Sequence, residues 1–115
     1  MRPMVIIDPE TIEWSSGTEG LSEGVMIKVL NEDKETGAMA LIGKLPAGYF
    51  EAKHSHPCSC EVIALQGKLV NTETGQDMSK GMFGHIPKGE LHGPFQVPED
   101  EDCILFVVTD GSLSD

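Results

Sequence analysis

Basic residues are scarce in this chain: eight Lys and Arg stand against nineteen Asp and Glu, so its 115 residues carry a formal net charge of −11. Proteins that bind nucleic acid or anionic lipid present a basic patch to the phosphate groups, and an acidic surface repels those groups. We therefore expect neither nucleic acid nor a membrane as a partner. The charge favours cations or neutral small molecules as ligands.

Cysteines and long apolar runs are also few. The chain has three cysteines, an odd number, and Cys58 and Cys60 are too close in sequence to hold a fold together, which argues against a disulfide framework. No apolar run approaches the roughly 20 residues that a membrane-spanning helix needs, and residues 1–8 do not have the features of a signal peptide. These observations predict a cytoplasmic location.

The hydrophobic residues, 39% of the chain, occur in short runs separated by Gly and Pro that are spread along the whole length. Such runs at intervals of roughly 8–12 residues predict a single all-β domain over residues 1–115. Because closed or wrapped sheets leave few exposed edges, we expect a small β-barrel or jelly roll. Residues 11–14 begin like a helix but meet Ser-Ser-Gly at once, so we expect a loop or an edge strand there. The predicted strands are residues 4–7, 24–31, 38–45, 50–56, 62–70, 82–86 and 103–109.

Three of the four histidines and one glutamate form the most informative pattern. His54 and His56 are two residues apart, so in a strand their imidazoles point to the same face, with Cα atoms about 6.8 Å apart. Glu61 opens the next strand and His92 follows a Pro-Lys-Gly turn, so both can return to the same point. Three imidazoles and a carboxylate suit a divalent transition ion and leave coordination positions open for other ligands. The residues therefore predict an open metal site.

Two segments resemble the paired motifs of the cupin superfamily. Residues 48–67, GYFEAKHSHPCSCEVIALQG, resemble the first motif, and residues 81–92, GMFGHIPKGELH, resemble the second. The spacing departs from the family pattern in one place, because five residues rather than six separate the motif's glutamate from its last glycine. The metal ligands that the resemblance implies are His54, His56, Glu61 and His92.

The resemblance implies a single cupin jelly-roll barrel with the metal in one mouth. Residues 25–44 are similar to small cupins related to the ChrR-type cupin domain and to acetylacetone and dihydroxyacetophenone dioxygenases. This likeness implies a dioxygenase-like enzyme for a small enolisable or phenolic substrate, with Fe(II) as the first choice of metal and Zn, Mn, Ni or Co as others. It also implies a homodimer, which agrees with the apolar strand at residues 103–108.

Other interpretations of the same residues stay open. One is a metal-dependent isomerase or epimerase of a sugar-like molecule, in which His85 or Glu90 serves as the base. Another is a metal or small-molecule sensor without catalysis, because one fold hosts many functions. Cys58 and Cys60, next to the proposed ligands, are interpreted either as thiolate ligands or a redox pair, or as loop residues out of reach of the metal.

Overall fold

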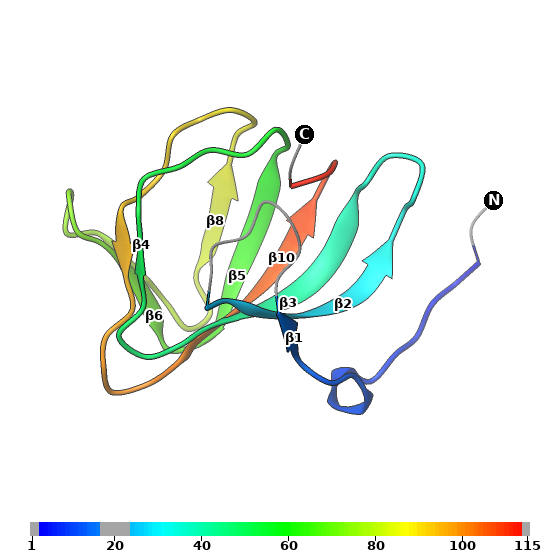
Figure 1. Cartoon of the computed structure of the whole chain (residues 1–115), viewed down its shortest axis with the longest axis horizontal. Coiled ribbons are helices and arrows are strands. Elements are labelled where there is room, and N and C mark those ends of the chain that lie inside the picture. Colours follow the sequence, from blue (N-terminus) through cyan, green and yellow to red (C-terminus); the bar gives the residue numbers. More distant parts are fainter. Residues whose placement is uncertain (1–2, 17–23, 114–115) are drawn as a thin grey trace.

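Two antiparallel sheets make up most of the computed structural model, which describes residues 3–16 and 24–113. The larger sheet has the strand order β1-β2-β3-β10-β5-β8, and the smaller has the order β4-β9-β6-β7. Figure 1 shows the smaller sheet lying across from the larger one. The expected jelly roll is thereby confirmed, although the two sheets are not closed on each other into a barrel.

The strands have the following bounds. The larger sheet contains β1 (Ser15–Ser16), β2 (Met26–Glu32), β3 (Met39–Leu45), β5 (Cys60–Gln66), β8 (Phe83–Ile86) and β10 (Cys103–Thr109). The smaller sheet contains β4 (Phe50–Glu51), β6 (Lys68–Asn71), β7 (Asp77–Ser79) and β9 (Phe95–Gln96). A 3-10 turn covers Pro9–Thr11, and none of the described residues forms a helix long and apolar enough to cross a membrane.

The strand predicted at residues 62–70 is divided at Gly67 into β5 and β6, which belong to different sheets. Gly67 has a φ of 68°, and a Cβ atom there would lie 2.5 Å from the carbonyl oxygen of Asp102. Only glycine adopts this backbone without strain. The chain can therefore turn from one sheet to the other within a single residue.

Side-chain alternation places the core between the two sheets. In β5, Cys60, Val62 and Ala64 are buried while the residues between them are exposed. The largest fully buried side chains are Ile27, Val97 and Cys103. Toward one end the core gives way to a cavity of about 370 Å³, so the interior is not filled throughout.

The N-terminal segment covers part of the outer face of the larger sheet. Lys28 on β2 donates a hydrogen bond from Nζ to the carbonyl of Pro9 at 3.0 Å, and the Lys28 and Lys44 ammonium groups lie 4.7 and 4.6 Å from the centre of the Trp14 ring. Such cation–π contacts fix the segment against β2 and β3. Residues 4–7, predicted as a strand, form none and extend away from the sheet with exposed side chains (Figure 1).

Candidate metal centre

An isolated antiparallel bridge brings two of the predicted ligands together. The backbone N–H of His54 donates to the carbonyl of His92 at 3.0 Å, and that of His92 donates to the carbonyl of His54 at 2.9 Å. Residues directly opposite each other in an antiparallel pair project their side chains to the same face. His56 follows two residues later, and its own carbonyl accepts a hydrogen bond from Gly89 at 2.9 Å. The two cupin-like segments are thus held side by side by their backbones.

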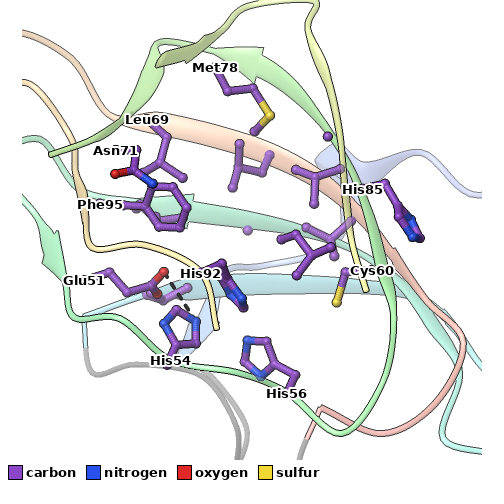
Figure 2. Close-up of a pocket in the computed structure, with 18 of the residues that line it drawn as sticks. Glu51, His54, His56, Cys60, Leu69, Asn71, Met78, His85, His92 and Phe95 are labelled. Atoms are coloured by element: carbon purple, nitrogen blue, oxygen red, sulfur yellow. Dashed lines mark ion pairs between the residues drawn. The ribbon is translucent and has the colours of Figure 1, made fainter. Parts of the chain in front are cut away.

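The three imidazoles form one cluster at the cavity (Figure 2). The ring centres of His54 and His92 are 4.2 Å apart, those of His54 and His56 are 4.9 Å apart, and those of His56 and His92 are 5.4 Å apart. One ligand nitrogen from each ring lies within 4.8 Å of the others, and all three residues are half-buried. The sequence expectation that these histidines converge is confirmed.

Backbone carbonyls set the tautomer of each ring. The Nδ1 atoms of His54, His56 and His92 lie 2.8, 3.3 and 3.1 Å from the carbonyl oxygens of Ala52, Leu113 and Glu90, in that order. A carbonyl only accepts, so Nδ1 of each ring carries the hydrogen and donates it. In a neutral ring this leaves the lone pair on Nε2, as in metal-bound histidines whose other nitrogen is held by a hydrogen bond.

Burial favours the neutral form of two of these rings. The pKa of His56 is lowered, chiefly by burial and further by the nearby His54. The pKa of His92 is also lowered, again chiefly by burial, against the opposing effect of its hydrogen bond to Glu90. Neutral imidazole is the form that binds metal ions. Ligand type, tautomer and ionisation therefore all fit a divalent transition ion.

Glu61, the predicted carboxylate ligand, does not join this cluster. It is the second residue of β5 and points to the outer face, because the preceding Cys60 points inward. Its side chain is 59% exposed, and its carboxylate lies 3.7 Å from Nδ1 of His85 on the neighbouring β8. The expected geometry would require β5 to be shifted by one residue, because such a shift exchanges the two faces of a strand.

Glu51 places a carboxylate beside His54, although it does not belong to the cluster that the three rings form. Its side chain is 15% exposed, and its Oε1 atom lies 3.6 Å from Nε2 of His54, as the dashed line in Figure 2 shows. Sequence reasoning missed this residue because the cupin motif places its glutamate at Glu61. No local signal was available, because a Phe-Glu pair in a strand is expected to bury the Phe, whereas the structure exposes Phe50 and turns Glu51 inward.

The side chains of the two predicted catalytic residues do not belong to the three-histidine cluster. His85 borders the cavity, but its side chain is half exposed and lies away from the three rings in Figure 2. Glu90 is exposed, and it is its backbone carbonyl that reaches the centre, through the hydrogen bond with His92. The geometry therefore gives Glu90 a role in holding a ligand ring.

The three cysteines are buried and form no disulfide. Burial raises the pKa of Cys60 to about 12 and that of Cys103 to about 11, and it raises the pKa of Cys58 as well. Such groups are neutral thiols near pH 7, whereas metal binding and redox exchange use the thiolate. The structure thus favours the interpretation in which Cys58 and Cys60 are not ligands.

The cavity beside the imidazoles is lined mainly by apolar side chains. Its wall opposite the histidines includes Leu69, Met78 and Phe95, and Asn71 adds a polar amide (Figure 2). The ring of Phe95 lies 6.1 Å from that of His92. A volume of about 370 Å³ lies in the range of small-molecule sites. A small, largely apolar molecule fits this space next to the three nitrogens.

Comparison with known families agrees with this geometry. The family model of the ChrR cupin-like domain matches residues 2–112, almost the whole chain. The chain belongs to the ChrR cupin-like domain family. No curated protein matches this ChrR cupin-like domain in sequence.

Solved structures share the fold of this ChrR cupin-like domain at low sequence identity. A Ralstonia eutropha protein of unknown function with a cupin-like fold is 21% identical, with a TM-score of 0.78 over 96% of this chain and 74% of that one. An acetylacetone dioxygenase from Acinetobacter johnsonii is 23% identical, with a TM-score of 0.67 over 94% of this chain and 74% of that one. The Rhodobacter sphaeroides complex of SigE with the anti-sigma ChrR gives 23% identity and a TM-score of 0.67, over 88% of this chain and 51% of that one.

Proposed function

We propose that this domain is a metal-dependent, dioxygenase-like enzyme for a small enolisable or phenolic substrate. One observation carries the proposal: three imidazoles, each with its Nδ1 held by a backbone carbonyl, converge at a largely apolar cavity of about 370 Å³. Similarity to the Acinetobacter johnsonii acetylacetone dioxygenase supports this substrate class.

Each part of the site has a distinct role in this proposal. His54, His56 and His92 would hold the ion, which when bound polarises oxygen ligands of the substrate as a Lewis acid and offers positions to dioxygen. The carbonyls of Ala52 and Glu90 keep two of the rings in the ligating tautomer. Apolar walls exclude water and select molecules without many polar groups. Fe(II) is the proposed metal, with Zn, Mn, Ni or Co as alternatives that the same donors accept.

A metal or small-molecule sensor is the second candidate. It is favoured by the family itself, because a structural neighbour is the anti-sigma ChrR in complex with SigE. A sensor of the metal ion alone needs no cavity for a second ligand, whereas the side chain of His54 is 26% exposed and the rings border a cavity. This accessibility favours the enzyme over a sensor of the metal ion alone. An isomerase would need a base near the metal, and the two candidates, His85 and Glu90, have exposed side chains that do not belong to the three-histidine cluster.

The proposed assembly is a homodimer. The outer face of the larger sheet is covered by the N-terminal segment at β2 and β3, whereas four apolar side chains on β5, β8 and β10 are 39–60% exposed. These are Ile63, Leu65, Phe83 and Val108. Residues 4–7 form an exposed apolar arm on the same molecule (Figure 1). The arm of a second copy would therefore offer an apolar surface to these four side chains.

Elemental analysis and oxygen uptake test the proposed activity. Protein purified without oxygen should contain about one metal ion per chain, and His54→Ala and His92→Ala should lose it. The Fe(II)-loaded wild type should consume oxygen with acetylacetone or a catechol. Metal without oxygen uptake would turn the assignment to the sensor, and absence of metal from the wild type after Fe(II) or Zn(II) loading would contradict the metal centre itself.

A further inference from the structure

The geometry points to Glu51 as the fourth protein ligand of the metal centre, in place of the motif residue Glu61. This inference rests on the proposed function, because it assumes that the three histidines hold an ion. It assigns a ligand role to a residue outside the pattern His54, His56, Glu61, His92 that the sequence motif predicts. Its basis is the position, burial and chemistry of the Glu51 carboxylate.

Strand pairing directs Glu51 into the site. β4 pairs with β9, with Phe50 opposite Gln96 and Glu51 opposite Phe95. Consecutive residues of a strand point to opposite faces, so the 54% exposed Phe50 side chain points outward and Glu51 points toward the cavity. Glu51 lines the same cavity as the three imidazoles. It reaches the site from the segment just before His54, which fixes its distance from that ring.

The contact between Glu51 and His54 joins two acceptors when the ring is neutral. Nδ1 of His54 donates to the carbonyl of Ala52, so Nε2 carries a lone pair. Oε1 of Glu51 lies 3.6 Å from this nitrogen. Two lone pairs that face each other in a half-buried site repel, unless a cation or a proton lies between them. A metal ion bound by both atoms removes this conflict.

The separation of the two atoms suits a shared ion. Nitrogen and oxygen ligands bind Zn²⁺ at about 2.0–2.2 Å, so two ligand atoms of one tetrahedral ion lie about 3.4 Å apart. The observed 3.6 Å between Oε1 of Glu51 and Nε2 of His54 is close to this value. The carboxylate lies outside the group of atoms within 4.8 Å of one another that the three histidines form, so ligation requires it to move toward His56 and His92. The carboxylate also balances part of the charge of a divalent ion, which three neutral imidazoles do not. Glu61 cannot serve in this way, because it faces solvent on the other side of β5 and contacts His85.

A cobalt titration with matched variants tests the assignment. Metal-free wild type, Glu51→Gln and Glu61→Gln are titrated with Co(II), with affinity measured against a competing chelator and coordination followed by the visible absorption bands. We expect one Co(II) per wild-type chain, binding at least about tenfold weaker in Glu51→Gln with changed bands, and no change in Glu61→Gln. Thermal unfolding of the metal-free proteins checks that the variants fold. Glu51→Asp, which keeps the charge, replaces Glu51→Gln if the latter does not fold and should give intermediate affinity.

The outcomes separate this inference from the function on which it rests. If wild type binds no Co(II), the result contradicts the proposed metal centre and, with it, the ligand role of Glu51. If wild type binds but Glu51→Gln shows the same affinity and bands, the centre stands and only the role of Glu51 is overturned. A weaker affinity with unchanged bands would make Glu51 a hydrogen-bonding partner outside the coordination sphere and overturn ligation. A loss of affinity in Glu61→Gln alone would return the role to the motif residue.

Discussion

His54 and His92 face each other across a single antiparallel bridge, in which each backbone N–H donates to the other residue's carbonyl. The two residues are 38 positions apart in sequence, and their ring centres are 4.2 Å apart. Their separation is set by backbone hydrogen bonds, so the rings are positioned before any ion binds. This preorganisation lowers the cost of assembling the site.

Metal-dependent stability should follow from this arrangement. A ligand that binds only the folded state stabilises it, by about 2.7 kcal/mol when its concentration is 100 times its Kd. We expect Zn(II) at that excess to raise the unfolding free energy of wild type by about this amount, and to leave His92→Ala unchanged. His85→Ala is the matched control, because His85 lies outside the cluster, and it should respond as wild type does. Urea unfolding with and without Zn(II) measures the effect, and an equal response of His92→Ala would argue against the site.

The histidines of the site were predictable from sequence and its carboxylate was not. The convergence predicted for His54, His56 and His92 is confirmed. The strand predicted over residues 50–56 is not, because β4 ends at Glu51 and His54 keeps only an isolated bridge to His92. The direction of the Glu61 side chain depends on where β5 begins, because Glu61 is the second residue of that strand. A shift of one residue exchanges the two faces of a strand, and no local signal fixes that parity. The inward position of Glu51 depends on the pairing of β4 with β9, which is a long-range contact.

Gly67 should be essential for the crossing from one sheet to the other. Ala at this position combines a left-handed backbone with a Cβ atom 2.5 Å from the Asp102 carbonyl oxygen, and the backbone conformation alone costs about 1–2 kcal/mol. We expect Gly67→Ala to lose more than this. Gly75→Ala is the control, because Gly75 has a φ of 78° but nothing within 4 Å of an added Cβ, so only the conformational cost applies. Equal losses for the two variants in urea unfolding would show that the close approach to Asp102 has no effect.

For the fold as well, local sequence predicted where strands lie but not how they pair. The strand predicted at residues 103–109 is confirmed residue for residue as β10, because its apolar, β-branched run is buried between β3 and β5. The strand predicted at residues 62–70 is wrong in its continuity, since Gly67 divides it. Residues 4–7 have strand-forming composition but no partner strand in the described part of the chain. Strand propensity therefore located the segments well, whereas pairing decided which of them became strands.

Buried thiols should make the protein less stable in alkaline solution. The pKa of Cys103 is raised from 9.0 to about 11 in the folded state, so unfolding releases a proton at pH values above 9. The stability contributed by the neutral thiol is present below pH 9 and is lost as the pH rises toward 11. Cys103→Ala should lose this part of the pH dependence, while other alkaline titrations remain in both proteins. Urea unfolding of the two metal-free proteins at pH 7.5 and pH 10 measures the difference, and parallel pH profiles would contradict it.

The exposed apolar face predicts where two copies meet. Ile63 lies on β5 opposite Phe83 of β8 and Phe106 of β10, at the centre of the uncovered part of the larger sheet. A lysine at this position would have to lose water on association, which opposes dimer formation. We expect wild type to sediment as a dimer at micromolar concentration and Ile63→Lys as a monomer. Phe50→Lys is the control, because Phe50 is similarly exposed on the smaller sheet. If wild type is a monomer, or if Ile63→Lys remains a dimer, this face is not the interface.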